Sequence, residues 1–396
     1  MKKTLKIVFG TRPELIKLAP LIRLIKGLSF NCKEFSGQFD CTVISTGQHK
    51  ELLSNLYEWF GFKPDIELNV MKENQTPSQV VSNILAALDE HVANSDCVVV
   101  QGDTATAFAS SLAGFMQKIP VAHIEAGLRT NNPYNPFPEE MLRRLISQVT
   151  TFHFPPADKA LDNLKRVDIQ DNVYVVGNTV IDALKETTER LEALEKKDGN
   201  AFQKAVQLPQ SIVNELQEPG RKLVLVTMHR RENHGEEHSQ VAKALKQISS
   251  KYPEALIVFP VHPNPNVKKA IEPHLSGLDN VCLLEPLDYV TFSWLLKKAF
   301  ILVTDSGGLQ EEGTFLKKPV LVLRETTERP EAIYSGYAKL IGTKEEVVFS
   351  EIEALLREKQ AEFVSPPFEV TSSLGNLVFG NGDASEQILQ CLAQKL

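Results

Sequence analysis

Short apolar runs recur along this chain, and segments with helical spacing separate most of them. The runs lie at 5–9, 41–45, 97–100, 120–124, 173–176, 223–227, 256–261, 281–284, 300–304 and 319–323. Between two of them, Val80, Ile84 and Leu88 illustrate the apolar spacing of an amphipathic helix. Continuous apolar strands joined by helices are typical of parallel strands buried on both faces. We therefore predict an α/β fold.

A charged segment interrupts this alternation in the middle of the chain. Residues 185–220 have helical character without an apolar strand, and a fresh apolar run begins just after them, at Lys222. We therefore predict two Rossmann-like doubly wound parallel-sheet domains that face a cleft. The expected segments are 1–180, 181–375 and a C-terminal segment, 376–396, whose helix runs from about Ala384 to Lys395 and packs back on the first domain.

Composition narrows the classes of partner. Of the 396 residues, 42% are hydrophobic and 23% are charged, and the net charge of −7 gives no overall attraction to nucleic acid or to an anionic membrane. The five cysteines include no C-x-x-C pair, so we expect neither a disulfide framework nor a thiolate zinc site. No apolar run approaches the roughly 18 residues of a membrane span, and the first run is too short for a signal peptide. We expect a cytoplasmic protein.

Polar residues follow the ends of many apolar runs, where open α/β sheets bind their ligands. Gly10–Arg12 follows the first run, and Gln101–Thr104 follows the third. Four of the nine histidines fall at such ends, namely His123, His153, His229 and His262. This clustering predicts a ligand site along the carboxyl edges of the sheets.

The turn after the first run, Gly10–Glu14, lacks the G-x-G-x-x-G pattern, so a dinucleotide is disfavoured as the ligand. Pro13 suits a first helical position, which places backbone N–H groups and a positive dipole end beside Arg12. Lys17 follows one turn later. These residues predict an anion or diphosphate site, and the alternative is an ordinary capped helix with surface cations.

The turn Asp305–Gly308 is the counterpart in the second half of the chain. Gly307 and Gly308 let the backbone approach a ligand closely, and Ser306 can donate to a phosphate oxygen at the helix start. Glu311 and Glu312 follow about one turn further along, and a carboxylate there can accept both hydroxyls of a ribose. Two such turns fit a nucleotide-diphosphate sugar. The alternative is that Asp305 is only the N-cap of the helix.

Three carboxylates are candidates for acid and base chemistry. Asp103 and Glu125 close neighbouring strands of the first sheet, so we expect them side by side at its carboxyl edge. Glu139 opens a helix, with Arg143 four residues further along the same face. Two close carboxylates push a pKa upward, as an acid or base near neutral pH requires. The alternatives are a helix cap for Asp103 and a helical salt bridge between Glu139 and Arg143.

His229 ends the first apolar run of the second half, and Arg230 and Arg231 follow it. A histidine and two arginines at a strand end suit the binding of a diphosphate leaving group, and a solvated charge run is the alternative. No H-E-x-x-H or comparable spacing occurs, so we assign no metal site.

Taken together, these segments resemble one family, the non-hydrolysing UDP-N-acetylglucosamine 2-epimerases, which have the GT-B fold. The matching stretches are FGTRPE (9–14), TGQH (46–49), QGDT (101–104), HIEAGLRT (123–130), PFPEE (136–140), GNTVIDAL (177–184), HRREN (229–233), PVHPNPNV (260–267), TDSGGLQEE (304–312) and TTERPEA (326–332). Each stretch is weak alone, but ten in the same order along nearly the whole chain are specific.

The resemblance implies a role for each matching position. Asp103, Glu125 and Glu139 serve the proton transfers at C2 of the sugar, with Arg143 nearby, and His229 lies against the diphosphate. The residues implied to bind the substrate or its UDP moiety are Arg12, Lys17, Arg143, Arg230, His262, Ser306, Gly307, Gly308, Glu312 and Arg329. Members of the family act as homodimers, use no nicotinamide cofactor and supply cell-surface polysaccharide synthesis.

The reaction implied is a reversible epimerisation of UDP-N-acetylglucosamine to UDP-N-acetylmannosamine. UDP leaves by anti elimination to give a 2-acetamidoglucal, and then adds back. Cations and helix N-termini around the departing diphosphate stabilise the broken C1–O bond. Which carboxylate acts as base and which as acid stays open.

A few positions depart from the family pattern. Leu142 stands where many relatives have Asn, and the stretch Gln48-His49-Lys50-Glu51 differs from the stretch that helps to form a second, activating UDP-N-acetylglucosamine site in bacterial members. Gln48 and His49 are the candidates for that allosteric site, and the departure at this stretch argues against activation there. The alternatives are epimerisation of a modified UDP-sugar (a diacetamido uronic acid or a 6-deoxy sugar), a hydrolysing epimerase that releases N-acetylmannosamine, a GT-B glycosyltransferase, and a non-catalytic UDP-sugar sensor.

Overall fold

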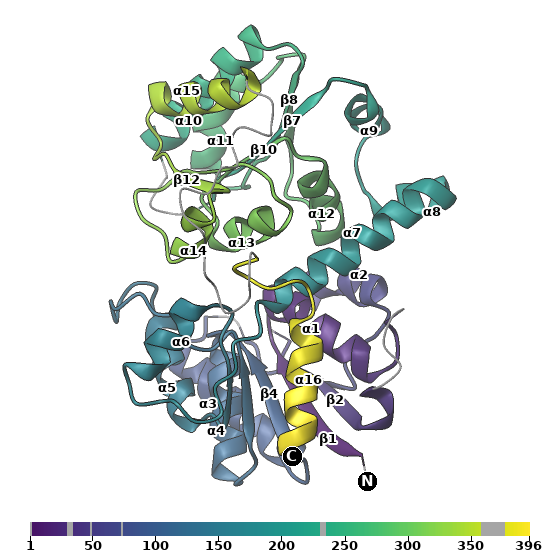
Figure 1. The fold of residues 1–396 in the computed structure, drawn as a ribbon, viewed down its shortest axis with the longest axis vertical. Helices are drawn as coiled ribbons and strands as arrows, with labels where there is room; N and C mark the ends of the chain where they lie inside the picture. Colours follow the sequence, from purple (N-terminus) through teal and green to yellow (C-terminus); the bar gives the residue numbers. More distant parts are fainter. Residues whose placement is uncertain (1, 30–34, 48–49, 73, 230–234, 358–376) are drawn as a thin grey trace. The chain divides into compact units, whose positions relative to one another are not determined.

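The computed structural model of this chain describes all 396 residues except 1, 30–34, 48–49, 73, 230–234 and 358–376. The chain forms two compact units (Figure 1). Undescribed residues aside, Met1–Lys185 with Ser372–Leu396 make up the first unit, and Glu186–Thr371 make up the second. Each unit contains a six-stranded parallel sheet flanked by helices. The predicted α/β fold with two Rossmann-like domains is confirmed.

The sheet of the first unit has the strand order β3-β2-β1-β4-β5-β6, and every neighbouring pair is parallel. Its strands are β1 (Lys3–Phe9), β2 (Phe39–Ser45), β3 (Ile66–Glu67), β4 (Cys97–Gln101), β5 (Val121–Ile124) and β6 (Phe152–Phe154). Its helices are α1 (Arg12–Ile25), η1 (Phe35–Gly37), α2 (Lys50–Phe60), α3 (Pro77–Val92), α4 (Ala105–Met116), α5 (Glu139–Val149), α6 (Asp158–Lys165) and α16 (Ala384–Lys395). The strand order reverses between β1 and β4, which is where doubly wound sheets place their ligand sites.

The C-terminal helix belongs to the first unit, far from its neighbours in sequence. Helix α16 packs against α1, and Figure 1 shows the two side by side, with the C-terminus near the start of β1. Helix α7 (Thr179–Lys197) crosses the boundary between the units.

The sheet of the second unit has the strand order β12-β11-β10-β7-β8-β9, again entirely parallel. Its strands are β7 (Lys222–Thr227), β8 (Ala255–Pro260), β9 (Val281–Leu284), β10 (Ile301–Thr304), β11 (Val320–Val322) and β12 (Ala338–Leu340). Its helices, besides the second part of α7, are α8 (Gly199–Ala205), α9 (Gln210–Gln217), α10 (Glu236–Lys251), α11 (Pro265–Leu275), α12 (Tyr289–Lys298), α13 (Gly307–Phe315), α14 (Pro330–Tyr334) and α15 (Glu345–Arg357).

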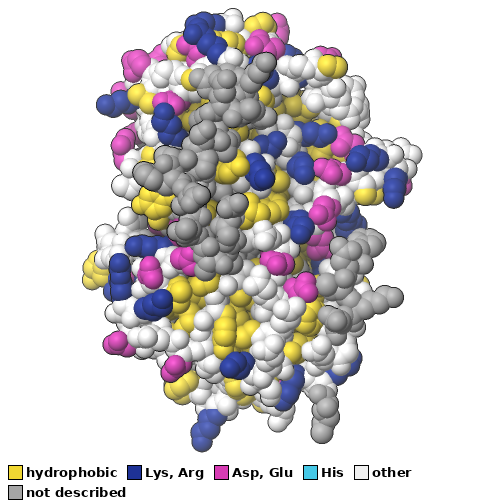
Figure 2. Space-filling model, in the orientation of Figure 1, with side chains coloured by type: hydrophobic (Ala, Val, Ile, Leu, Met, Phe, Trp, Pro, Cys, Tyr) yellow, Lys and Arg dark blue, Asp and Glu magenta, His cyan; other side chains and the backbone are white. Residues whose placement is uncertain are grey.

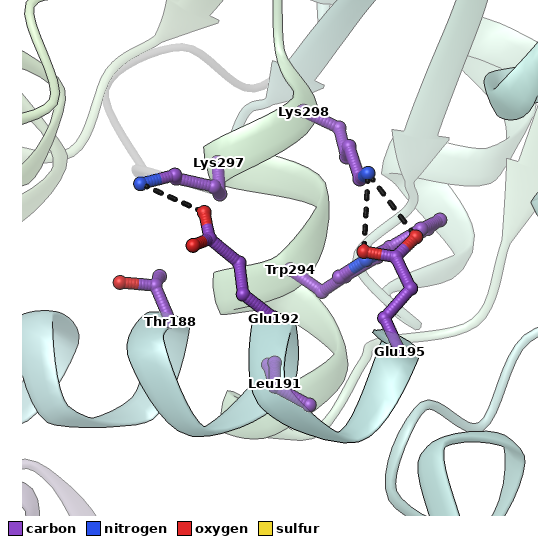
Figure 3. Close-up of a pocket in the computed structure, with 7 residues that line it drawn as sticks. All are labelled: Thr188, Leu191, Glu192, Glu195, Trp294, Lys297 and Lys298. Carbon is purple, nitrogen blue, oxygen red and sulfur yellow. Dashed lines mark hydrogen bonds and ion pairs between the residues drawn. The ribbon is translucent and has the colours of Figure 1, made fainter. Parts of the chain in front are cut away.

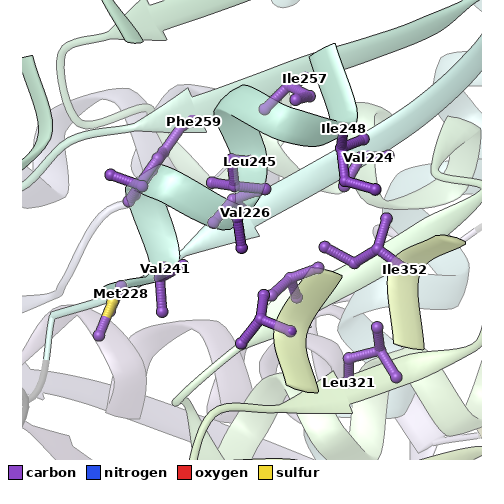
Figure 4. Close-up of a cluster of buried hydrophobic side chains, with 14 of the residues drawn as sticks. Val224, Val226, Met228, Val241, Leu245, Ile248, Ile257, Phe259, Leu321 and Ile352 are labelled. Atoms are coloured by element: carbon purple, nitrogen blue, oxygen red, sulfur yellow. The ribbon is translucent and has the colours of Figure 1, made fainter. Parts of the chain in front are cut away.

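The core of the second unit shows why its strands are continuous apolar runs. Val224 and Val226 of β7 lie in one buried cluster with Val241 and Leu245 of α10 and with Ile352 of α15 (Figure 4). Burying one such side chain contributes about 1.5–3 kcal/mol. The apolar spacing along α10 therefore fixes which face of that helix covers the sheet.

One apolar run does not form the strand that we predicted. In residues 173–176 only Val173 makes a bridge, an isolated one with His153. Tyr174 and Val176 still donate to the carbonyl oxygens of His153 and Pro155, but Pro155 has no backbone N–H with which to continue a strand pairing. Strands β3, β6 and β12, which have two or three residues each, were not predicted.

The described surface mixes charges of both signs. On the face shown in Figure 2, Lys and Arg side chains alternate with Asp and Glu side chains over both units. Among the described residues, no helix combines the length and the apolar character that crossing a bilayer requires.

Candidate functional site

The Glu125 carboxylate lies buried at the end of β5, where three side chains donate to it. Its Oε2 accepts hydrogen bonds from Lys17 Nζ at 2.5 Å and from Gln101 Nε2, and its Oε1 accepts one from Asn178 Nδ2 at 3.2 Å. The side chain is only 6% exposed. One ammonium and two amide donors favour the ionised form of a buried carboxylate.

Four separate elements bring these groups together. Gln101 is the last residue of β4 and pairs with Ile124, the residue before Glu125, across two neighbouring parallel strands. Lys17 comes from α1, and Asn178 immediately precedes α7. Glu125 has a φ of 66°, in the left-handed region, which turns the chain sharply at the end of the strand. The strand end and two helix starts therefore converge on one carboxylate.

Asp103 follows the neighbouring strand β4, and Arg143 holds its carboxylate. Arg143 Nε donates to Asp103 Oδ2 at 2.7 Å, and Arg143 Nη1 lies 3.4 Å from Glu140 Oε2. The alternative of a Glu139–Arg143 salt bridge is therefore wrong: Arg143 contacts the carboxylates of Asp103 and Glu140. The capping alternative for Asp103 is wrong as well, because Thr104 is the N-cap of α4.

His123 supports the turn that carries Asp103. Its Nε2 lies 2.7 Å from the carbonyl oxygen of Gly102, so Nε2 carries the proton and donates it. Burial lowers the pKa of His123 to about 3, which keeps the ring neutral at physiological pH. Gly102 has a φ of 74°, a conformation that glycine adopts without strain.

Glu139 differs from the other two candidate carboxylates. It is the first residue of α5, and its Oε2 is buried without a hydrogen-bond partner among the described residues. A buried acceptor without a partner is costly, so such groups in native proteins call for an explanation. Among the described residues, Glu139 is therefore the candidate carboxylate with a buried oxygen that a ligand could contact.

The turn after β1 differs in part from the prediction. Glu14 Oε2 accepts the backbone N–H groups of Gly10 at 3.0 Å and Thr11 at 2.7 Å, and burial raises the pKa of Glu14. Lys17 reaches Glu125 instead of lying in this turn. Arg12, the first residue of α1, has no ion-pair partner among the described residues, so it remains the cation that this turn offers to an anion.

In the second unit, Asp305 orients His229. The fully buried carboxylate of Asp305 accepts the backbone N–H of His229 at 3.0 Å and lies 3.1 Å from its Nδ1. The two residues follow neighbouring strands, β10 and β7, and the His229 side chain is 52% exposed. Ser306, not Asp305, is the N-cap of α13, so the capping alternative for Asp305 is wrong.

Helix α13 begins with Gly307 and Gly308, and a Cβ added to Gly308 would meet no atom within 4 Å. The open backbone at this helix start can accommodate an anion. Further along α13, the buried Glu311 accepts a hydrogen bond from Arg329 Nε. Glu312 is 8% exposed. Arg329 therefore contacts Glu311, which lies on the same helix as the predicted nucleotide-binding residues.

The remaining predicted residues divide into two groups. His262 follows β8, and its Nδ1 accepts the backbone N–H of Asn264 at 3.2 Å. Gln48, His49 and Arg230 lie outside the described residues.

Gln101 and Asn178 are functional candidates that sequence reasoning did not select. Gln101 could have been selected from the sequence, because it ends the apolar run next to the one that Glu125 follows. In the structure it pairs with Ile124, the residue before Glu125. Asn178 lies 53 residues after Glu125, and no local pattern indicates a contact over that separation.

A cavity of about 210 Å³ lies between α7 and α12 in the second unit (Figure 3). Lys297 pairs with Glu192 at 3.2 Å and Lys298 pairs with Glu195 at 3.1 Å, so its charges cancel. The two lysines end α12 just before β10 begins, at the opposite edge of the sheet from Asp305. This cavity is therefore separate from the candidate site. Over the described part of the chain, no cluster of three His, Cys, Asp or Glu side chains could hold a metal ion.

Known proteins resemble this chain over nearly its full length. A family model described as UDP-N-acetylglucosamine 2-epimerase matches residues 32–393. The UDP-N-acetylglucosamine 2-epimerase of Neisseria meningitidis serogroup A is 41% identical over 396 residues, which cover 97% of this chain and 98% of that protein.

Two solved structures share the fold and contain nucleotide ligands. A crystal structure of the Neisseria meningitidis UDP-GlcNAc 2-epimerase bound to UDP-GlcNAc has a TM-score of 0.80 and 40% identity, and covers 99% of this chain and 100% of its own. The Methanocaldococcus jannaschii UDP-GlcNAc 2-epimerase in complex with UDP-GlcNAc and UDP has a TM-score of 0.74 and 31% identity, with 99% of both chains covered.

Proposed function

Because this chain belongs to the UDP-N-acetylglucosamine 2-epimerase family, we propose that it interconverts UDP-N-acetylglucosamine and UDP-N-acetylmannosamine without hydrolysis. The single observation that carries the proposal is the group of three carboxylates at the start of α5 and the ends of β4 and β5. Glu125 is held by Lys17, Gln101 and Asn178, Asp103 is held by Arg143, and Glu139 has a buried oxygen without a protein partner.

The reaction proceeds by elimination and re-addition. A carboxylate takes the proton from C2, the C2–H electron pair forms the C1–C2 double bond, and the C1–O bond breaks as UDP leaves. UDP then adds back to C1 of the 2-acetamidoglucal while a second carboxyl group delivers a proton to the opposite face of C2. Asp103, Glu125 and Glu139 serve these transfers, and the unpartnered oxygen makes Glu139 the group most available to move a proton.

Departure of UDP carries most of the barrier, since no carbonyl group acidifies the C2 proton. Cationic and dipolar groups that meet the developing charge on the diphosphate lower this barrier. Arg12 supplies a cation that has no ion-pair partner within the described parts of the chain, and His229 is held in place by the buried Asp305 of the second unit. Arg230 belongs to the same proposal by resemblance alone.

The second unit binds the UDP moiety in this proposal. Ser306, Gly307 and Gly308 at the start of α13 contact the phosphates, and Glu312 accepts the ribose hydroxyls. His262 lies at the end of β8 on the same sheet. Arg329 acts on this pocket indirectly, because its guanidinium pairs with the buried Glu311 one residue before Glu312. The reaction needs no cofactor, since the hydrogen moves as a proton.

We further propose that the protein is a homodimer whose product feeds cell-surface polysaccharide precursors. Large apolar side chains of the first unit are exposed at the end of α4, in the segment just before α5 and on α5 itself. They are Phe115, Met116, Tyr134, Phe137, Met141 and Leu145. Helices α4 and α5 pack against each other, which supports a contact with a second copy over this face.

Product analysis tests the proposed function. We would incubate the purified protein with UDP-N-acetylglucosamine and follow products by phosphorus and proton NMR. An equilibrating UDP-N-acetylmannosamine signal is the expected result. Accumulating UDP with free N-acetylmannosamine would instead indicate a hydrolysing epimerase, and unchanged substrate would direct the search to modified UDP-sugars.

A further inference from the structure

Asn178 links the C-terminal segment of the chain to the Glu125 carboxylate. We propose that Asn178 is a positioning residue, which holds Glu125 in its reactive orientation and is itself held by the C-terminal segment 377–396. The inference deepens the proposed function and rests on it. It starts from the 3.2 Å hydrogen bond between Asn178 Nδ2 and Glu125 Oε1, formed between two buried side chains.

The orientation of the Asn178 amide is determined by its own backbone. Its Oδ1 accepts the N–H of Val180 at 3.1 Å, in the first turn of α7. The Nδ2 group must therefore face Glu125, and it can only donate. The contact thus selects an unprotonated Oε1 on Glu125 and fixes the plane of the carboxylate.

The C-terminal segment fixes the backbone of Asn178. The N–H of Asn178 donates to the carbonyl oxygen of Phe379 at 2.9 Å. Gly177 and Gly380 pass so closely that a Cβ on Gly177 would lie 2.8 Å from the Phe379 oxygen and 2.9 Å from Gly380 Cα. Both glycines have positive φ, so a side chain at either position would be strained as well as crowded.

A second contact holds the same segment to α7. The buried Asp182, one turn after Asn178, accepts the N–H groups of Ala384 at 3.3 Å and Ser385 at 2.7 Å, at the start of α16. Helix α16 also packs against α1, which carries Lys17. Two of the three donors to Glu125 therefore come from elements that the C-terminal segment contacts.

Substitution of Asn178 tests the proposal. Asn178→Ala removes the donor, and Asn178→Asp replaces it with an acceptor that repels Glu125. Lys17 pairs with Glu125 and the neutral His123 lies near it, and neither residue is altered in these variants. We expect kcat to fall by about 100-fold with KM nearly unchanged, since a small displacement of a reacting group carries a cost of this order.

Asn163 provides a matched control. Its buried amide also makes a hydrogen bond within the first unit, from Nδ2 to the carbonyl oxygen of Gly127 at 3.0 Å, but it does not contact a candidate carboxylate. We expect Asn163→Ala to retain kcat. Wild-type kcat in both Asn178 variants would overturn the proposal, and so would an equal loss of kcat in the Asn163 and Asn178 variants.

An NMR measurement that does not require catalytic turnover tests the positioning role of Asn178 independently of the proposed epimerase activity. In protein labelled with ¹³C at the Cδ of glutamate, Glu125 gives a carboxyl resonance. This resonance is identified because it disappears in the Glu125→Gln variant. We expect this resonance to shift in Asn178→Ala and in Gly380→Ala and to stay in place in Asn163→Ala. If the wild type proves inactive on UDP-N-acetylglucosamine, this shift still supports the positioning role, and an unmoved resonance in the Asn178 variant overturns it.

Discussion

At the scale of single residues, two adjacent glutamates show how strongly surroundings determine the role of a carboxyl group. Glu139 has a buried oxygen without a partner, whereas Glu140 accepts the N–H of Thr130 at 2.9 Å and Arg144 Nη2 at 2.8 Å. Burial opposes ionisation of Glu140, but its donors lower the pKa below the ordinary value. Glu139 is therefore free for chemistry, and Glu140 stabilises the turn before α5.

This contrast predicts opposite phenotypes for two similar substitutions. Glu139→Gln should lower kcat by about 10²- to 10⁴-fold, the usual contribution of a general acid or base, with the unfolding free energy unchanged. Glu140→Gln should reduce the unfolding free energy by about 2 kcal/mol, because a buried charged hydrogen-bond acceptor is lost. Steady-state kinetics and urea denaturation of both variants measure these effects. A loss of stability in Glu139→Gln together with a loss of kcat alone in Glu140→Gln would contradict the prediction.

At the scale of elements, helix starts carry most of the candidate site, and buried ion pairs keep them in place. Arg329, at the start of α14, donates to Glu311 of α13, and these side chains are 13% and 1% exposed. Breaking such a pair by removing one partner leaves a charge in a buried environment. We infer that the Arg329–Glu311 contact holds α13 in place, as the hydrogen bonds to Asp182 hold the start of α16.

The Glu311–Arg329 pair gives a prediction for the second unit. Arg329→Met should destabilise this unit by about 3–5 kcal/mol and weaken UDP binding, because Glu311 loses its guanidinium partner. The double variant Glu311→Gln with Arg329→Met should recover part of this stability. A double-mutant cycle measured by urea denaturation tests the coupling. Additive losses would show that the two side chains do not stabilise each other.

Asp182 gives a prediction about pH. Burial raises the pKa of Asp182 to about 6 in the folded protein, against about 4 for a free aspartate. Since the folded state binds this proton more tightly, the contribution of Asp182 to stability falls as pH rises from about 4 to 6. The two pKa units correspond to about 3 kcal/mol.

Comparison with Asp182→Asn isolates this effect. The unfolding free energy of the variant minus that of the wild type should rise by about 3 kcal/mol between pH 4 and pH 7. Urea denaturation across this range measures the difference. The exposed Asp171→Asn serves as control and should show no such trend. A flat difference for Asp182→Asn would mean that its carboxyl group titrates normally.

Sequence patterns predicted the elements better than the contacts between them. The ends of β4 and β5 were identified from apolar runs, and these two strands are neighbours in the sheet, as the prediction of Asp103 beside Glu125 requires. Lys17 and Glu125 are 108 positions apart in the sequence, and no local sequence pattern predicts an ion pair over that separation. Lys17 was instead predicted to serve an anion site with Arg12, at the turn where Glu14 accepts the backbone N–H groups. Long-range packing decided these contacts.

At the scale of the whole molecule, the net charge of −7 means that local groups must attract an anionic substrate. Arg12, Lys17 and His229 belong to strand ends or helix starts of the two sheets, and their surroundings, not a general positive field, determine what they bind. Several large apolar side chains of the first unit are also exposed, and the proposed contact with a second copy would bury those of α5.

The dimer proposal predicts a separable effect on assembly. Met141→Glu with Leu145→Glu should convert the protein to a monomer, because two charges would be buried in the contact between copies. These side chains are 38% and 43% exposed, so the variant should fold normally. Val167→Glu, at another exposed position, should leave assembly unchanged. Sedimentation velocity measures the outcome, and a wild-type monomer would contradict the assignment.

The proposed mechanism requires that one carboxylate removes the C2 proton and that another returns a proton to the opposite face of C2. A proton held on one side of the sugar cannot be delivered to the other, so the epimer must take its C2 hydrogen from solvent. The direct test is proton NMR of the reaction with UDP-N-acetylglucosamine in D2O. We predict UDP-N-acetylmannosamine with deuterium at C2. Epimer that keeps protium at C2 would contradict the account.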